Sequence, residues 1–244
     1  MALNPMHQFE VYKIGPEINL NGINLSFTNS SLFMMISSGL ILSLLFLGTK
    51  RKYLIPTKIQ LITEMSYTFV AKMINDTAGS SAKSFFPFIF TLFMFVLFCN
   101  MVGMLPYSFT VTSHNIITFI LASVVFVGVT IIGFIKHGIK YLELFVPKGV
   151  PVILLPLIVI IEIISYLSRP VSLSVRLFAN MMAGHTMLKV FGGFVISLGL
   201  LGGWLPLGFS VALTGLEILV AFLQAYVFAI LTCIYLNDAL NLHH

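Results

Sequence analysis

The sequence predicts an all-α integral membrane protein, and two observations carry that prediction. Apolar residues make up 58% of the 244 residues and charged residues only 9%, against about 25% charged residues in soluble domains. Several apolar runs reach the roughly 20 helical residues that are needed to cross about 30 Å of hydrocarbon. A membrane β-barrel would instead show alternating segments of about ten residues.

The positions of the basic residues predict the topology. The net charge of +5 comes from Lys and Arg residues that cluster at the ends of apolar runs. This distribution is a topology signal and not a sign of nucleic-acid binding. The cluster at 50–52 and the lysines that follow residue 135 therefore predict the inner side of the membrane. The loop before Asn115 carries no Lys or Arg, as expected on the outer side.

We expect a single membrane domain over residues 1–244, with five membrane-crossing helices and one interfacial amphipathic helix. In the amphipathic stretch, Ile62, Met65, Phe69 and Met73 recur at helical spacing, which favours a helix lying along the inner surface. The expected segments are an outer N-terminal segment 1–28, spans 30–49, 85–105 and 116–136, the interfacial helix 57–80, and two long helices 150–191 and 205–238.

The stretch 150–191 is too long for a simple span because it contains no polar loop, only Pro156 and Pro170 as breakers. A straight helix of this length would measure about 63 Å, twice the thickness of the hydrocarbon. It is either a tight helical hairpin or one kinked, steeply tilted helix, with a bend marked by Pro170. We expect a glycine-rich outer turn at 192–206, followed by a second long, steeply tilted helix.

Polar residues lie on one stripe of each long helix. Glu162, Arg169 and Arg176 are spaced by seven residues, which is a drift of only about 20° per heptad. In the final helix, Glu217 and Gln224 are also seven apart, and Asp238 follows another fourteen residues on. Four further residues belong near the first stripe or continue it: Ser165, Ser172, Asn180 and His185. Polar and charged side chains are costly against lipid. We therefore expect the stripes to face each other or a watery cleft.

Arg176 is the most informative member of this set. An Arg side chain does not lose its charge in proteins, and holding it near a bilayer centre costs roughly 2.5–3.5 kcal/mol on insertion scales. A single intramembrane Asn, His or Glu–Arg pair is readily structural, but the full set on two helices favours function. Titratable groups in single file are typical of a proton relay, and a permanent charge among them suits an electrostatic barrier.

The sequence lacks the residues that redox, metal, nucleotide or serine-hydrolase chemistry would require. The sequence has no Cys cluster and no paired His for a redox centre, no metal-ligand spacing, no nucleotide-binding motif and no G-x-S-x-G elbow. We therefore expect no cofactor, no metal and no catalytic site of the chain's own.

Three segments resemble subunit a of F-type ATP synthases. They are SYLSRPVSLSVRLFANMMAGH at 165–185, LEILVAFLQAYVFAILTCIYLND at 216–238 and PYSFTVTSH at 106–114. The resemblance covers nearly the whole chain, and the RLFAN core at 176–180 is highly specific. It implies a stator subunit of the proton-conducting Fo motor, part of an H⁺-transporting two-sector ATPase, in which two long inclined helices embrace a rotor ring.

The resemblance also implies partners and roles. The partners are the c-ring, whose subunits each carry one carboxylate, subunit b of the peripheral stalk, the rest of the F1Fo complex and the lipid bilayer. Arg176 corresponds to the essential arginine at the interface with the c-ring, which separates two offset half-channels. The outer half-channel would involve Asn180, His185, Glu217 and Gln224, and the inner one Glu162, Ser165, Arg169 and Ser172.

One departure from the family pattern is informative. Some bacterial members hold Glu and His in the opposite order at the positions of His185 and Glu217. The exchange predicts that these two side chains are neighbours that share a proton or a hydrogen bond.

Two alternatives remain open from the sequence. A stand-alone proton- or sodium-coupled secondary transporter would show inverted repeats with paired broken helices, which we do not find. A purely structural scaffold would predict that Glu217→Gln leaves proton flux unchanged. The expected location is an energy-transducing membrane, with the bacterial inner membrane favoured over the mitochondrial one and H⁺ favoured over Na⁺.

Overall fold

The computed structural model describes residues 9–14, 19–20, 23–24, 26–50, 55–105, 108–146 and 154–241. Parts of several predicted features lie outside these residues. They include most of the N-terminal segment 1–28, residues 51–52 of the basic cluster, the first two residues of the 106–114 motif, and the start of the expected helix 150–191.

The described residues are mainly helical, as the composition predicts. An antiparallel pair of two-residue strands, β1 (Asn19–Leu20) and β2 (Ile23–Asn24), is the only sheet among them. The helices are α1 (Asn29–Lys50), α2 (Lys58–Ala78), α3 (Phe86–Gly103), α4 (Asn115–His137), α5 (Leu155–Gly202) and α6 (Trp204–Leu240). Three 3₁₀ segments connect them: η2 (Ser80–Phe85), η3 (Val111–Ser113) and η4 (Gly138–Phe145).

Within the described residues, five helices are long and apolar enough to cross a membrane, which confirms the predicted number of spans. They are α1, α3, α4, α5 and α6, and α2 is not among them. Thr57 caps α2 by accepting a hydrogen bond from the Gln60 amide. Ile62 and Met65 on α2 are exposed, while Val70, Met73 and Ile74 are buried. An exposed apolar face suits the predicted interfacial position, which stays a prediction.

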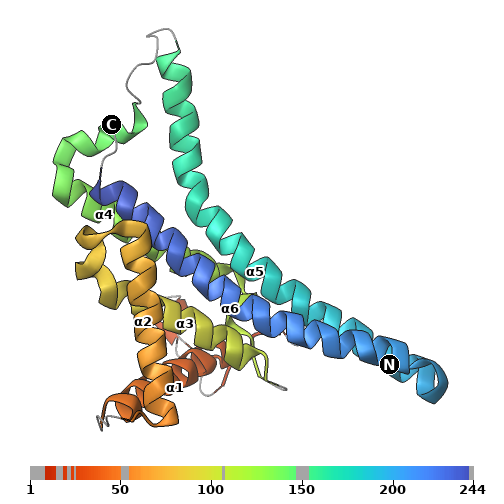
Figure 1. The fold of residues 1–244 in the computed structure, drawn as a ribbon. Coiled ribbons are helices and arrows are strands. Elements are labelled where there is room, and N and C mark those ends of the chain that lie inside the picture. Colours follow the sequence, from red (N-terminus) through yellow and green to blue (C-terminus); the bar gives the residue numbers. More distant parts are fainter. Residues whose placement is uncertain are drawn as a thin grey trace.

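Two regions make up the molecule (Figure 1). Helices α1 to α4 gather on one side, while α5 and α6 extend beyond them as a pair whose connecting turn forms the far tip. Helix α6 packs against α2, α3, α4 and α5, and α5 packs against α4 and η3. The core under this crossing is formed by side chains such as Phe93, Val125, Leu177, Phe228 and Leu236.

The long segment is one bent helix and not a hairpin. Helix α5 runs over 48 residues with Pro170 inside it, which corresponds to about 72 Å if it were straight. Proline has no N–H for the Tyr166 carbonyl and favours a bend. In Figure 1 the first part of α5 diverges from α6, and the later part runs beside it.

The turn to α6 lies within the predicted stretch 192–206 but is shorter and begins later than predicted. Gly192 and Gly193 remain helical, and the first non-helical residue is Gly199, at φ 61° and ψ −158°. This conformation is open to glycine and strained for other residues. The expected turn at 192–206 is therefore confined to the neighbourhood of Gly199 and Gly203.

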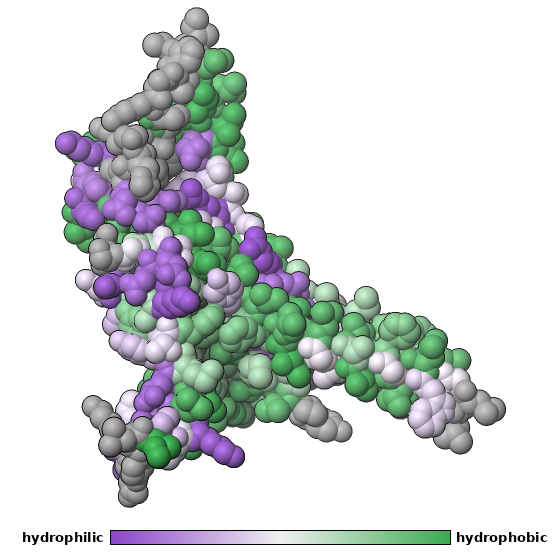
Figure 2. Space-filling view, viewed as in Figure 1, coloured by the Kyte–Doolittle hydropathy of each residue, from purple (hydrophilic) through white to green (hydrophobic). Residues whose placement is uncertain are grey.

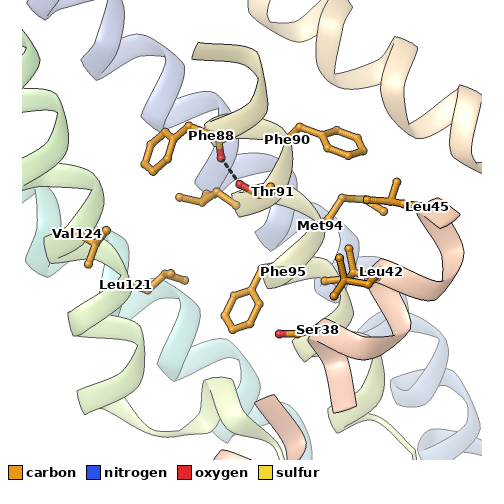
Figure 3. A pocket seen from close by; sticks show the side chains of 12 residues that line it. Ser38, Leu42, Leu45, Phe88, Phe90, Thr91, Met94, Phe95, Leu121 and Val124 are labelled. Carbon is orange, nitrogen blue, oxygen red and sulfur yellow. Dashed lines mark hydrogen bonds between the residues drawn. The ribbon is translucent and has the colours of Figure 1, made fainter. Parts of the chain in front are cut away.

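The surface in view is largely apolar along the α5–α6 arm, and hydrophilic residues gather nearer the α1–α4 side (Figure 2). An apolar groove of about 390 Å³ lies between α1, α3 and α4 (Figure 3). Its two hydroxyl groups bond to their own helices, because Ser38 donates to the Met34 carbonyl and Thr91 donates to the Pro87 and Phe88 carbonyls.

Candidate functional site: a polar path along α5 and α6

The predicted site residues fall into three groups along α5. His185 and Glu217 meet at the predicted outer end, where α5 and α6 run side by side. Ser172, Arg176 and Asn180 form the middle group, and all three side chains are exposed. Arg169 lies at the predicted inner end, beside Asp238 of α6.

The outer group confirms that His185 and Glu217 are neighbours. The Nδ1 atom of His185 lies 3.5 Å from Oε1 of Glu217, and both side chains are largely buried, with exposures of 12% and 6%. On the other side of the ring, Nε2 lies 3.1 Å from the Thr110 hydroxyl. Glu217 Oε1 has no hydrogen-bond partner in the described part of the chain, so the two groups lie within ion-pair distance of each other without hydrogen-bond geometry.

Gly184 makes the approach of the carboxylate possible. A Cβ atom at this position would lie 2.7 Å from Glu217 Oε1, well inside van der Waals contact. The absence of a side chain therefore lets the carboxylate lie against the α5 backbone beside His185.

A second polar contact fixes the α3–α6 crossing near this group. Asn100 is fully buried; its amide nitrogen donates to the Ala221 carbonyl at 3.2 Å, and its oxygen accepts from Thr112 at 2.8 Å. Ala221 lies one turn after Glu217 on α6, so Asn100 and Thr112 hold the helix that carries the carboxylate. A buried network with satisfied partners of this kind rigidifies its surroundings.

The middle group, Ser172, Arg176 and Asn180, has no comparable hydrogen-bond network among the described residues. Arg176 is exposed, and among the residues that the structure describes it forms no hydrogen bond or ion pair. The side chains of Leu173, Ser174 and Leu177 are buried instead, and Ser174 contacts Thr118 at 3.1 Å. The face of α5 that bears Arg176 therefore points away from the packed interior.

The expectation that the stripes face each other holds at two points, and the alternative of a watery cleft stays a prediction. The stripes meet at His185–Glu217 and at Arg169–Asp238, whereas Ser172, Arg176 and Asn180 are exposed. Helix α5 uses the face of Leu173 and Leu177 for packing, which turns Arg176 outward. The remaining predicted residues are less defined: Glu162 and Gln224 are half-buried, Ser165 is exposed, and within the described segments none of these side chains forms a hydrogen bond.

The inner group encloses Arg169. Its guanidinium donates to Asp238 Oδ2 at 3.3 Å and lies over the rings of Tyr166 and Tyr235, at 5.3 and 5.0 Å from their centroids. The Tyr166 hydroxyl in turn contacts Tyr141 at 3.0 Å and Thr130 at 2.7 Å. Two rings and one carboxylate thus hold this arginine in place.

Comparison with known proteins decides the family. The family model described as ATP synthase A chain matches residues 31–237, which span all five candidate transmembrane helices. This chain belongs to the ATP synthase A chain family.

Individual members of the ATP synthase A chain family are similar over the full length. ATP synthase subunit a of Pelagibacter ubique is 78% identical over 244 residues, covering 100% of both chains. ATP synthase subunit a of Chelativorans sp. is 58% identical with 100% of both chains covered, and that of Rhizobium rhizogenes is 59% identical over 99% of this chain and 98% of its own.

Membership of the ATP synthase A chain family confirms the resemblance drawn from the three motifs. It makes the chain a multi-pass membrane subunit of an ATP synthase, with a role in proton transport and ATP synthesis. It gives no support to the stand-alone transporter alternative.

Sequence reasoning assigned no role to several residues of the site. Thr110 and Thr112 stood in the quoted 106–114 motif, but no spacing connects them with His185 or Asn100, which lie on other elements. Tyr166 and Tyr235 stood in the quoted 165–185 and 216–238 motifs without a role of their own. Their positions three residues before Arg169 and Asp238 are the one available signal, because side chains at i and i+3 of a helix are neighbours.

Proposed function

We propose that the chain is the proton-translocating stator of the Fo motor and that Arg176 faces a rotor ring of c subunits. The observation that carries this proposal is the exposure of Arg176 on a largely apolar helix. Arginine keeps its charge in proteins, and a charge at membrane depth faces a protein partner or water and not lipid. A partner with an intramembrane carboxylate meets that requirement.

The neighbours of Arg176 support contact with a helical partner. Membrane helices approach closely where their surfaces carry small residues. The exposed small residues on α5 around Arg176 are Ser165, Ser168, Ser172, Ala179 and Ala183. A c-subunit helix can therefore bring its carboxylate close to the guanidinium.

The proposed path has two offset half-channels that meet beside Arg176. Asn180, His185, Glu217 and Gln224 form the outer one, in which the His185–Glu217 contact provides an exchangeable proton. Glu162, Ser165 and Ser172 line the inner one. The positive charge of Arg176 favours the ionised form of a passing carboxylate and repels protons, which prevents direct leakage between the half-channels.

Arg169 has a different role in this proposal. Its contacts with Asp238, Tyr166 and Tyr235 anchor α5 to α6 at the inner end, so we assign it to holding the inner half-channel in shape. A guanidinium does not deprotonate in proteins, which argues against a role as a proton carrier.

The proposal includes subunit b of the peripheral stalk and the rest of F1Fo as partners, on the strength of the resemblance. The bacterial sources of the relatives favour the bacterial inner membrane as the location. The paired His185 and Glu217 favour H⁺ as the transported ion.

The test is Arg176→Ala in the complete ATP synthase, measured as ATP synthesis driven by a proton gradient in vesicles. We expect synthesis to be abolished while the variant still co-isolates with a small ring subunit. Normal coupled synthesis in the variant would contradict the proposal, as would a wild-type chain that purifies without a ring subunit.

A further inference from the structure

The hydroxyl group of Thr110 lies between a carbonyl and a histidine ring. It donates to the Gly103 carbonyl at 3.2 Å and lies 3.1 Å from Nε2 of His185. Thr110 is buried, with 5% of its surface exposed. A Cβ atom on Gly103 would lie 2.8 Å from Cγ2 of Thr110, so the glycine is what admits this close approach.

The hydrogen-bond capacities of the three groups restrict the position of the protons. A hydroxyl has one hydrogen to donate and two lone pairs, and a carbonyl only accepts. With its hydrogen directed to Gly103, the Thr110 oxygen is free to accept from Nε2–H of His185. The Gly103 carbonyl also accepts from Ser108 Oγ at 3.0 Å, and its second lone pair accommodates Thr110.

The opposite nitrogen of the ring faces the carboxylate. Nδ1 of His185 lies 3.5 Å from Glu217 Oε1. Which nitrogen of a histidine keeps its proton is set by the hydrogen bond that the other one makes. Nε2–H bonded to Thr110 therefore leaves Nδ1 as the site of exchange.

We propose that Thr110 is a positioning residue, which keeps a proton on Nε2 of His185 so that the transported proton passes between Nδ1 and Glu217. This inference rests on the proposed function. In the transfer, the Nδ1–H bond of the imidazolium breaks and an O–H bond forms on the Glu217 carboxylate. The ring becomes neutral, the carboxylate becomes neutral, and Nε2–H stays on the Thr110 oxygen throughout.

Few other groups compete for the ring. The ionisable groups that face His185 in the described part of the chain are Glu217 from α6 and Lys189, one turn further along α5. The ring of Phe9 meets His185 edge-on at 6.5 Å between centroids and offers no titratable group. Thr110 from the loop between α3 and η3 supplies the contact at Nε2.

The experiment compares three variants of the complete ATP synthase. Thr110→Val removes the hydroxyl at nearly constant shape, and Thr110→Ser keeps it. Thr186→Val is the matched control, because Thr186 follows His185 directly and its hydroxyl donates only to the Met182 carbonyl of its own helix. The measurement is ATP-driven proton pumping into vesicles as a function of pH.

We expect Thr110→Val to slow pumping on the order of tenfold, because the hydroxyl orients the base without carrying the proton itself. The pH profile of pumping by Thr110→Val should also shift, since either ring nitrogen of His185 can then hold the exchangeable proton. Thr110→Ser and Thr186→Val should stay close to wild type. Adding Thr110→Val to Glu217→Gln should cause little further loss, as is typical of residues that act as one unit.

Two outcomes would overturn the inference: Thr110→Val pumping with the rate and pH profile of Thr186→Val, or Thr110→Ser failing as badly as Thr110→Val. Failure of the proposed function looks different, because Glu217→Gln and Arg176→Ala would then pump normally. If Glu217→Gln slows pumping while Thr110→Val does not, only the role of Thr110 is refuted.

Discussion

Arg169 and Arg176 are two arginines of one helix, seven residues apart, in opposite surroundings. Arg169 is surrounded by Asp238 and two tyrosine rings, whereas Arg176 is exposed and forms no hydrogen bond or ion pair with the described residues. The protein thus neutralises Arg169 with a carboxylate of its own and leaves Arg176 exposed at its surface. The difference shows that a costly intramembrane charge is informative about partners only when its own chain leaves it unsatisfied.

The largest effect should come from Arg176→Lys, with Arg169→Lys as the matched comparison. Lysine at position 176 would also be a cation, but its pKa shifts readily when it is buried, and it lacks the planar, forked guanidinium of arginine. We therefore expect Arg176→Lys to lower coupled ATP synthesis by about 100-fold or more. Arg169→Lys keeps the charge opposite Asp238, and we expect synthesis to stay within about threefold of wild type. Equal losses in the two variants, measured in the same vesicle preparation, would remove the distinction between the arginines.

Glu217→Gln should have the next largest effect. The amide keeps the shape of the side chain but cannot exchange a proton with His185, and a positioned acid–base group contributes about 10²–10⁴-fold. We expect proton pumping to fall by about 100-fold while assembly is unaffected. The control is Gln224→Glu, which adds a carboxyl group two turns away and should not restore pumping when combined with Glu217→Gln.

Gly184→Ala should have an intermediate effect through geometry alone. The added methyl group meets Glu217 Oε1 at 2.7 Å, and the flexible carboxylate moves away from His185 to relieve the overlap. We expect pumping to fall about tenfold with normal amounts of assembled complex. Gly192→Ala on the same helix is the matched control, because its added Cβ would meet nothing within 4 Å. A loss of pumping in both variants would point to a general effect on α5.

The smallest effect should come from Asp238→Asn. The ion pair with Arg169 is partly exposed, at 23% and 35%, so its contribution to stability is at most about 1 kcal/mol. The two tyrosine rings remain over Arg169 in the variant. We expect a thermal midpoint of the detergent-solubilised complex that is lower by a few degrees or less, and pumping close to wild type. A loss of pumping comparable to Glu217→Gln would place Asp238 in the proton path.

Much of the fold could be predicted from the sequence because hydropathy and charge act on whole segments. The number of spans followed from run lengths. The proximity of His185 and Glu217 followed from an exchange seen in a known family. The residue pattern alone could not predict the orientation of Arg176, since periodicity fixes angles within a helix but not which side of it meets a neighbour; the family resemblance implied that this arginine faces the c-ring. The contact of Thr110 with His185 joins residues 75 positions apart, and no spacing rule reaches that far.

The exposed guanidinium also constrains how the subunit is made. Before assembly, Arg176 would lie against lipid or draw water and headgroups into the bilayer, at a cost of roughly 2.5–3.5 kcal/mol. In the proposed function a carboxylate of the ring removes that cost, so the proposal predicts that the newly inserted chain is least stable when alone and gains stability when the ring binds. The residue proposed to keep the two half-channels apart would then also disfavour an orphan subunit that could leak protons across the membrane.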